Sequence, residues 1–288
     1  MRALGMGGTK KLNRSFGGTL ILFLFLAFIA FFMGMPMVLT ISNAFKPLDE
    51  LFLFPPRFFV RNPTVSNFSD MFILMQESWV PFSRYVLNSI IITGFGTAGH
   101  LLFASMAAYP LAKHVFPGKA ILFSMVVLAL MFSGHVTHIP NFLIISALGI
   151  NNTYLAVILP AFSAALGLYL MKQFMEQIPD SLIESSRLDG ANEFYIWRKI
   201  VMPNVKPAWL TLMILMFQAL WGSTGGILIR SEQLRPLPFA LTQLAGGGIA
   251  RAGVGAATML IMMLVPVTFF IFAQSKMIET LTTSGMKD

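Results

Sequence analysis

The sequence predicts an all-α membrane protein with six transmembrane helices and a long cytoplasmic loop between the fourth and fifth. Hydrophobic residues make up 56% of the 288 residues and charged residues only 11%, and the mean hydropathy is +0.74. Six apolar runs each approach the roughly 20 helical residues that a hydrocarbon core requires. The runs lack the alternation of barrel strands, and lipid cannot satisfy backbone polar groups, so each is expected to be a helix.

The six runs are identified in chain order by length and apolar composition. The first follows a basic stretch, but it is longer than a signal-peptide core and has no convincing small-x-small cleavage site, so we interpret it as an uncleaved anchor. The expected spans are residues 19–41, 86–108, 120–140, 154–171, 208–229 and 254–273. Residues 1–288 are therefore expected to form a single transmembrane domain.

Charge sets the expected orientation. The majority of the 20 lysine and arginine residues fall in the N-terminal tail, in residues 109–119, in residues 172–207 and in the C-terminal tail. Because cytoplasmic segments are enriched in these residues, both termini are predicted to be cytoplasmic in a multi-pass protein of the cell membrane. The net charge of +8 points to an anionic membrane surface, and no soluble basic segment with interleaved aromatic residues indicates nucleic-acid binding. The absence of cysteine excludes disulfides and thiol catalysis.

Two loops are longer than a simple connection requires. The external loop, residues 42–85, is rich in proline and aromatic residues, a composition typical of interfacial packing or of a surface that meets a partner. A short amphipathic segment lying along the membrane is the alternative interpretation.

The cytoplasmic loop, Lys172 to Pro207, has the pattern of two short helices. Pro179 is expected to end the preceding helix, and Ser181 and Glu184 have the spacing of a capping box, which predicts a new helix start. Gly190 then breaks that helix, because glycine tolerates the left-handed backbone of a sharp turn.

Beyond this turn the sequence predicts a second short helix with one apolar face, ended by Pro203 and Pro207. The expected face is formed by Phe194, Trp197 and Val201, with Ile200 beside them. A bent helical pair of this kind is expected where something must push on the membrane helices.

The same loop resembles the permease signature of binding-protein-dependent ABC importers, written E-A-A, three residues, G, nine residues, I-x-L-P. Glu184, Gly190, Ile200 and Pro203 have the required spacing. The chain departs from the signature at Ser185 and Ser186, where alanines are usual, and at Met202, where leucine is usual. Over nearly its whole length the chain resembles the carbohydrate branch of this family. The residues that carry this resemblance are Ala44-Phe45-Lys46-Pro47, Asn88-Ser89, Tyr109, Ile178-Pro179 and Asp189-Gly190-Ala191.

The resemblance implies a permease subunit of a maltose-type or related oligosaccharide importer, which is not itself an enzyme. Its implied partners are a homologous second permease, two ATP-binding cassette subunits and an extracytoplasmic solute-binding protein. ATP and Mg²⁺ would be bound by the ATPase subunits, so no cofactor is expected in this chain. The implied ATPase-docking residues are Glu184, Ser185, Ser186, Asp189, Gly190, Ala191, Ile200 and Pro203. From local spacing alone, Glu184 has a second interpretation as a cap of its own helix.

The spans offer weaker candidates. A sugar route lined by Thr211, Gln218, Trp221 and Ser223 is one hypothesis, because sugars need hydrogen bonds and an aromatic platform; helix–helix contact is the simpler interpretation. His135 and His138 are close enough in sequence to share a metal, but no carboxylate or cysteine accompanies them, so interfacial hydrogen bonding is favoured. His100 is expected to face the bundle.

Three other functions are weighed against an oligosaccharide permease. A permease for a polyamine, an amino acid or a glycerol phosphate differs only in cargo. A carrier driven by an ion gradient would place ionisable groups at mid-membrane, where the predicted spans hold almost none. A membrane hydrolase would need a carboxylate pair, a metal cluster or an activated nucleophile, and the glycine-rich residues 246–248 lack the lysine of a phosphate loop.

Overall fold

The computed structural model describes residues 16–76 and 79–284, and this part of the chain is helical with no strand. Four of its helices are long and apolar enough to cross a membrane, or six segments if each of two bent helix pairs counts as one span. The elements are α1 Phe16–Ala44, α2 Leu48–Leu51, α3 Ser66–Gln76, α4 Phe82–Lys113, α5 Lys119–Met131, α6 Gly134–Ala147, α7 Leu155–Phe162, α8 Ala165–Glu176, α9 Asp180–Leu188, α10 Glu193–Tyr195, η1 Ile196–Val201, α11 Met202–Asn204, α12 Lys206–Trp221, η2 Glu232–Leu234, α13 Leu237–Ala245, η3 Ile249–Arg251 and α14 Ala252–Ser284.

Helix α4 is the centre of the bundle and packs on α7, α8, α12 and α13. Glycines allow these close approaches: a Cβ on Gly96 would meet Leu220 of α12, and a Cβ on Gly167 of α8 would meet the ring of His100. Small residues serve this purpose in membrane helix packing, where lipid supplies no hydrophobic drive between helices.

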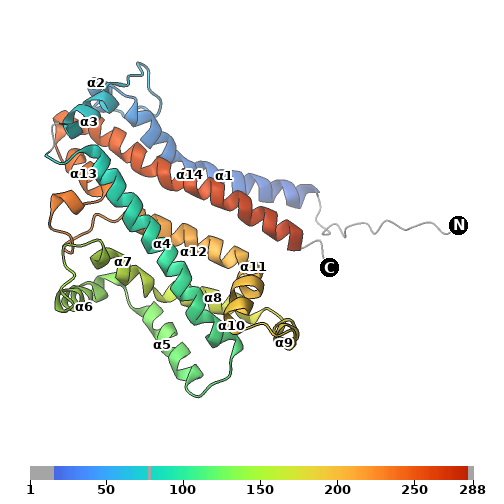
Figure 1. Ribbon diagram of the computed structural model, residues 1–288. Coiled ribbons are helices and arrows are strands. Elements are labelled where there is room, and N and C mark those ends of the chain that lie inside the picture. Colours follow the sequence, from blue (N-terminus) through green and yellow to red (C-terminus); the bar gives the residue numbers. More distant parts are fainter. Residues whose placement is uncertain (1–15, 77–78, 285–288) are drawn as a thin grey trace.

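The ends of the helices divide the molecule into two regions. Figure 1 shows the first turn of α1, the last turn of α14 and the segment from α9 to α11 at one end, with α2, α3 and α13 at the other. We call these the inner and the outer end. The predicted orientation partly depends on basic residues of the two chain tails; those of the N-terminal tail and Lys287 lie outside the described residues, whereas Lys276 lies in the last turns of α14.

The third and fifth predicted spans are interrupted by sharp breaks, whereas the fourth is divided between α7 and α8 by residues 163–164. Within residues 120–140, α5 ends at Met131, Phe132 is extended, and the following helical segment is inclined at 115°. Within residues 208–229, α12 ends at Trp221, because the following chain turns through Gly225 and Gly226, which have left-handed backbone angles of +76° and +49°. Apolar composition continues through both breaks, so hydropathy alone does not reveal them.

The external loop folds into α2 and α3 against the first turn of α14. Asn67 of α3 is buried and donates to the carbonyls of Ala44, at 2.9 Å, and Lys46, at 2.8 Å. The buried carboxylate of Glu50 accepts from the backbone N–H of Arg61 at 2.9 Å. The loop is therefore held to the end of α1 by buried polar contacts.

Candidate functional site

The loop between α8 and α12 forms the expected helical pair, but its first helix begins differently from the prediction. Pro179 is the N-cap of α9 and makes no side-chain capping bond, so Ser181 lies inside the helix and the predicted capping box is wrong. The helix starts one residue before the serine because Asp180 already has helical geometry after the extended Pro179. Gly190 follows α9 with a φ of +83°, which confirms the predicted left-handed turn.

The second helix of the pair contains a π-helical stretch, Ile196–Val201, which changes its buried face. Ile196, Trp197 and Val201 are buried, whereas Phe194 is 56% exposed, so the predicted face was wrong at Phe194 and missed Ile196. A π-helix bonds residues five apart, so Ile196 and Val201 share a face that a period of 3.6 does not predict.

The two expected proline stops act at a different position. Pro203 lies inside the short α11 and Pro207 in the first turn of α12, and the chain bends by 82° between them. Val205, at this bend, is buried in the inner core. The helix therefore continues past Pro203 and ends at Asn204, so the predicted stop at Pro203 was wrong by one residue. Pro203 is tolerated because a proline in the first turn of a helix needs no N–H partner.

A hollow of about 570 Å³ lies between α9 and the second helix. It is lined by Ser186, Asp189, Gly190, Ala191, Asn192, Tyr195, Lys199 and Ile200. Of the predicted docking residues, five thus meet in one hollow, while Glu184, Ser185 and Pro203 do not line it. Asn192 accepts from the N–H of Tyr195 at 2.8 Å and so caps the second helix, a role that an asparagine two residues after a glycine turn could have indicated.

Glu184 and the two serines differ in their contacts. Glu184 is exposed and has no hydrogen-bond or ion-pair partner among the described residues, so it does not cap its own helix. The hydroxyls of Ser185 and Ser186 both donate to the carbonyl of Leu182, at 3.1 and 2.7 Å. Their polar groups are therefore satisfied within α9.

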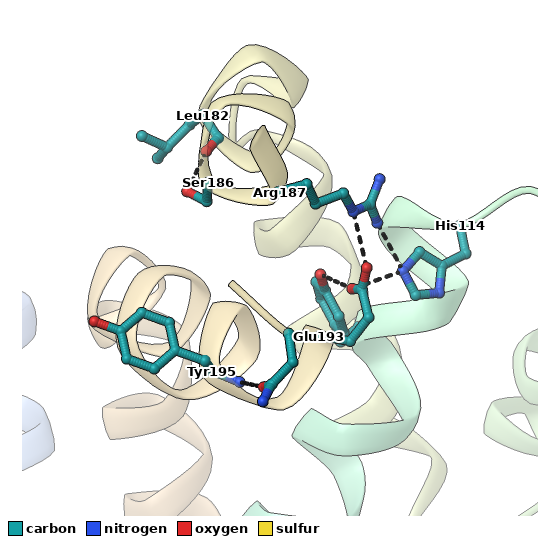
Figure 2. A network of polar contacts seen from close by, with 8 residues as sticks. His114, Leu182, Ser186, Arg187, Glu193 and Tyr195 are labelled. Carbon is teal, nitrogen blue, oxygen red and sulfur yellow. Dashed lines mark hydrogen bonds and ion pairs between the residues drawn. The ribbon is translucent and has the colours of Figure 1, made fainter. Parts of the chain in front are cut away.

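Glu193, which the sequence analysis missed, is the hub of the polar contacts in this loop (Figure 2). Its Oε2 accepts from the Tyr109 hydroxyl at 2.7 Å and lies 3.1 Å from Nε2 of His114, and its Oε1 accepts from Nε of Arg187 at 2.8 Å. Burial opposes ionisation, but the hydrogen bonds from Arg187 and Tyr109 and the contact with His114 outweigh it and lower the pKa of Glu193 to about 2.

A second polar contact joins α4 to the start of α9. Lys113, in the last turn of α4, donates to Oδ1 of Asp180 at 2.7 Å and to the carbonyls of Glu176 and Ile178. The hydrogen bond from Lys113 lowers the pKa of Asp180 below its ordinary value. The carbonyls belong to the end of α8 and the residues after it, where unpaired acceptors attract a cation.

The residues predicted for a sugar route are not gathered in one site. Thr211 donates to the carbonyl of Pro207 at 2.9 Å, Gln218 is exposed, and Trp221 is buried with its ring stacked on Phe217. Ser223 lines a separate hollow of about 380 Å³ at the outer end of α12. That hollow is also lined by His138, Asn141, Phe142, Val157, Pro160, Gly222, Thr224 and residues 225–228.

The histidines do not form a described metal site. His100 is buried and its Nδ1 lies 2.8 Å from the carbonyl of Ala161, so it faces the bundle as predicted. The side chain of His135 is outside the described residues, so its predicted hydrogen bonding remains a prediction. Within the part of the chain that the structure describes, no three metal-ligating side chains gather.

Comparison with known proteins identifies the family. Residues 10–283 match the family model described as "Binding-protein-dependent transport system inner membrane component". The chain is 31% identical over 273 residues to the arabinooligosaccharides transport system permease protein AraQ of Halalkalibacterium halodurans, covering 91% of this chain and 94% of that protein. It is 26% identical to the galactooligosaccharides transport system permease protein GanQ of Bacillus subtilis, covering 92% and 94%.

A solved structure shares the fold. A chain of a bacterial ABC transporter involved in the import of the acidic polysaccharide alginate superposes with a TM-score of 0.76 at 20% identity, covering 92% of this chain and 99% of that one. The family model and the relatives span almost the whole sequence, including the loop with Glu184 and Gly190. The chain therefore belongs to the family of inner-membrane permease components of binding-protein-dependent transport systems, and it is a transport protein rather than an enzyme.

Proposed function

We propose that this chain is the permease subunit of an ATP-driven importer of an oligosaccharide or a related carbohydrate. The full-length similarity to permeases named for arabino- and galacto-oligosaccharide transport supports the cargo class. In this proposal six spans cross the membrane and both termini lie in the cytoplasm. The bent pair of α5 and α6 counts as one span, whereas α12 alone forms the fifth span, because α10, η1 and α11 belong to the cytoplasmic loop. The common end of α1, α14 and the loop with α9 supports that orientation (Figure 1).

The importer we propose contains a homologous second permease, two ATP-binding cassette subunits and an extracytoplasmic solute-binding protein. ATP and Mg²⁺ belong to the ATPase subunits, and this chain carries no cofactor of its own. The shared family of binding-protein-dependent transport systems supports this assembly.

The observation that carries the coupling role is the hollow beside Gly190. It is open to solvent and lies at the inner end. The small residues Ser186, Gly190 and Ala191 on its lining permit close approach of another protein, and Tyr195 and Lys199 complete the wall. The carboxylate of Glu184, which has no partner within residues 16–76 and 79–275, adds one acceptor on the same helix pair. A charge-assisted hydrogen bond contributes roughly 1.5 to 3 kcal/mol when the pair is desolvated, against about 0 to 1 kcal/mol for an exposed pair. Docking of the ATPase over Glu184 would supply that desolvation.

As a binding site for the solute, the hollow that contains Ser223 is a better candidate than Thr211, Gln218 and Trp221 of α12, which are not gathered in one place. Amide, imidazole and hydroxyl groups alternate there with the Phe142 ring, a combination that suits sugar hydroxyls and a sugar face. Thr211, Gln218 and Trp221 are kept as candidate pathway residues along the helix that leads to it.

Two variants test the coupling. Glu184→Lys and Gly190→Pro are expected to leave membrane insertion intact and to reduce ATP-driven uptake by vesicles that contain the whole importer. The double variant Ser185→Ala with Ser186→Ala is expected to be tolerated, because the hydroxyls of both serines donate to a carbonyl within α9; loss of uptake would show that these hydroxyls contribute to docking. Normal uptake by both coupling variants would refute ATPase docking at this loop.

Two further measurements test the class and the cargo. Uptake by vesicles holding this subunit without ATPase subunits would indicate an ion-gradient carrier instead. The cognate solute-binding protein is expected to bind arabino- or galacto-oligosaccharides in calorimetry. Binding of a polyamine, an amino acid or a glycerol phosphate in their place would reassign the cargo.

A further inference from the structure

Helix α9 has few apolar contacts with the rest of the protein. Ile183 is its one buried residue, and Leu188 at its end is 89% exposed. Apolar packing is non-directional and, with a single buried anchor, it leaves the angle of α9 free to change. The orientation of this helix must therefore depend on polar contacts at its two ends.

Both ends of α9 are tied to the inner end of the same helix, α4. At its first residue, Asp180 pairs with Lys113 at 2.7 Å. At its last turn, Arg187 meets Glu193 at 2.8 Å, and Glu193 in turn holds Tyr109 and His114. Figure 2 shows Glu193 between Arg187 and His114, with the three side chains coming from three separate segments.

The chain that follows α9 reaches the bundle through bends. The chain that follows α9 passes through the Gly190 turn and then bends by 82° before α12. Helix α4, in contrast, continues without a break from Phe82 to Lys113 and forms the centre of the bundle. A continuous helix transmits a displacement of its end better than a bent connection.

We propose that Glu193 is a positioning residue that makes α9 and the inner end of α4 move as one rigid unit, so that a displacement of α9 by the ATPase reaches the membrane bundle through α4. This inference rests on the proposed docking at α9. It adds that the carboxylate, by accepting from Arg187 of α9 and Tyr109 of α4, fixes the angle between the two helices. Glu193 itself touches neither nucleotide nor solute.

The experiment measures the angle and the coupling separately in the assembled importer. The chain has no cysteine, so Leu188→Cys and Val115→Cys introduce its only thiols, at positions 89% and 99% exposed. Spin labels at these sites report the distance from the end of α9 to the residues just after α4. In the otherwise unmodified chain we expect one narrow distance distribution that stays narrow with and without ATP.

Glu193→Gln is expected to broaden this distribution and to lower the solute imported per ATP hydrolysed by at least about fivefold, the lower range of coupling between sites. The ATPase subunits should stay bound during purification. The matched control is Glu232→Gln, which weakens a similar contact, Tyr85 to Glu232 at 2.8 Å, at the outer end of α4. This control should keep the narrow distribution, so a general loss of stability does not imitate the effect.

Three outcomes would overturn the proposal: an unchanged distribution in Glu193→Gln, unchanged import per ATP, or loss of the ATPase subunits, which would make Glu193 a docking residue. Failure of the docking proposal gives a different result. In that case Glu184→Lys retains bound ATPase and normal uptake, whereas the label distances still report whether Glu193 fixes α9 to α4.

Discussion

The contact between Gly167 and His100 allows one prediction to be worked through. A Cβ on Gly167 would overlap the imidazole of His100, which is buried and donates to the carbonyl of Ala161 at 2.8 Å. Gly167→Ala must therefore displace the ring or separate α4 from α8. Overpacking costs about 1 to 3 kcal/mol and a lost hydrogen bond about 0.5 to 1.5 kcal/mol, while alanine gains about 0.5 to 1 kcal/mol over glycine in a helix. We expect a net destabilisation of about 1 to 3 kcal/mol.

Thermal unfolding of the purified importer in lipid nanodiscs, followed by intrinsic tryptophan fluorescence, measures this loss. Gly94→Ala is the matched control, since Gly94 lies in α4 with no atom within 4 Å of an added Cβ, and it should not lower the midpoint. Adding His100→Ala to Gly167→Ala should recover part of the loss, because the small side chain removes the clash. A midpoint unchanged by Gly167→Ala, or strictly additive losses in the double variant, would refute the contact.

Three further predictions concern the loops. The contacts of Glu193 lower its pKa from 4.5 to about 2, so they stabilise the loop above pH 4.5 and are lost as the pH drops toward 2. The distribution of distances between the two spin labels should broaden over that range, and an unchanged distance distribution would contradict this prediction. Asn152 has a left-handed backbone, with φ +60°, and its side-chain amide group donates to the hydroxyl of Ser231 while its side-chain oxygen accepts from the Ser231 N–H. Both Asn152→Ala and Asn152→Gly lose these bonds, but only alanine is strained at a positive φ, so Asn152→Ala should speed proteolysis near Ser231 more than Asn152→Gly. Gly190→Ala should cost about 1 to 2 kcal/mol of local strain and reduce uptake, whereas Gly149→Ala, equally left-handed at φ +69°, should reduce uptake less.

The sequence predicted the features that depend on local chemistry. Apolar composition located the four helices that are long and apolar enough to cross a membrane, and Gly190 marked the turn because few other residues adopt a left-handed backbone at low cost. The breaks after Met131 and Trp221 were not predictable in the same way. Hydropathy measures whether a residue suits lipid, and it contains no information about the direction in which the next turn of helix points.

Glu193 was missed for a different reason. Its partners Tyr109 and His114 lie about 80 residues earlier in the chain, so no spacing rule connects them to it. The only local signal was Arg187, six residues before it, and a surface pair of that kind is common and usually weak. Only the packing of α4 beside the loop turns an ordinary glutamate into a shared acceptor.

The choice of a polar hub at this position has a physical reason. The side chain of Glu193 is 49% exposed, so solvent screens its ion pairs and each contributes little to stability. Hydrogen bonds are directional, however, and donors from two segments, Arg187 of α9 and Tyr109 of α4, restrict an angle that an apolar contact would leave free. A leucine at this position would also add apolar surface next to the hollow beside Gly190. The carboxylate thus orients α9 and leaves the hollow beside Gly190 accessible to solvent and to a partner protein.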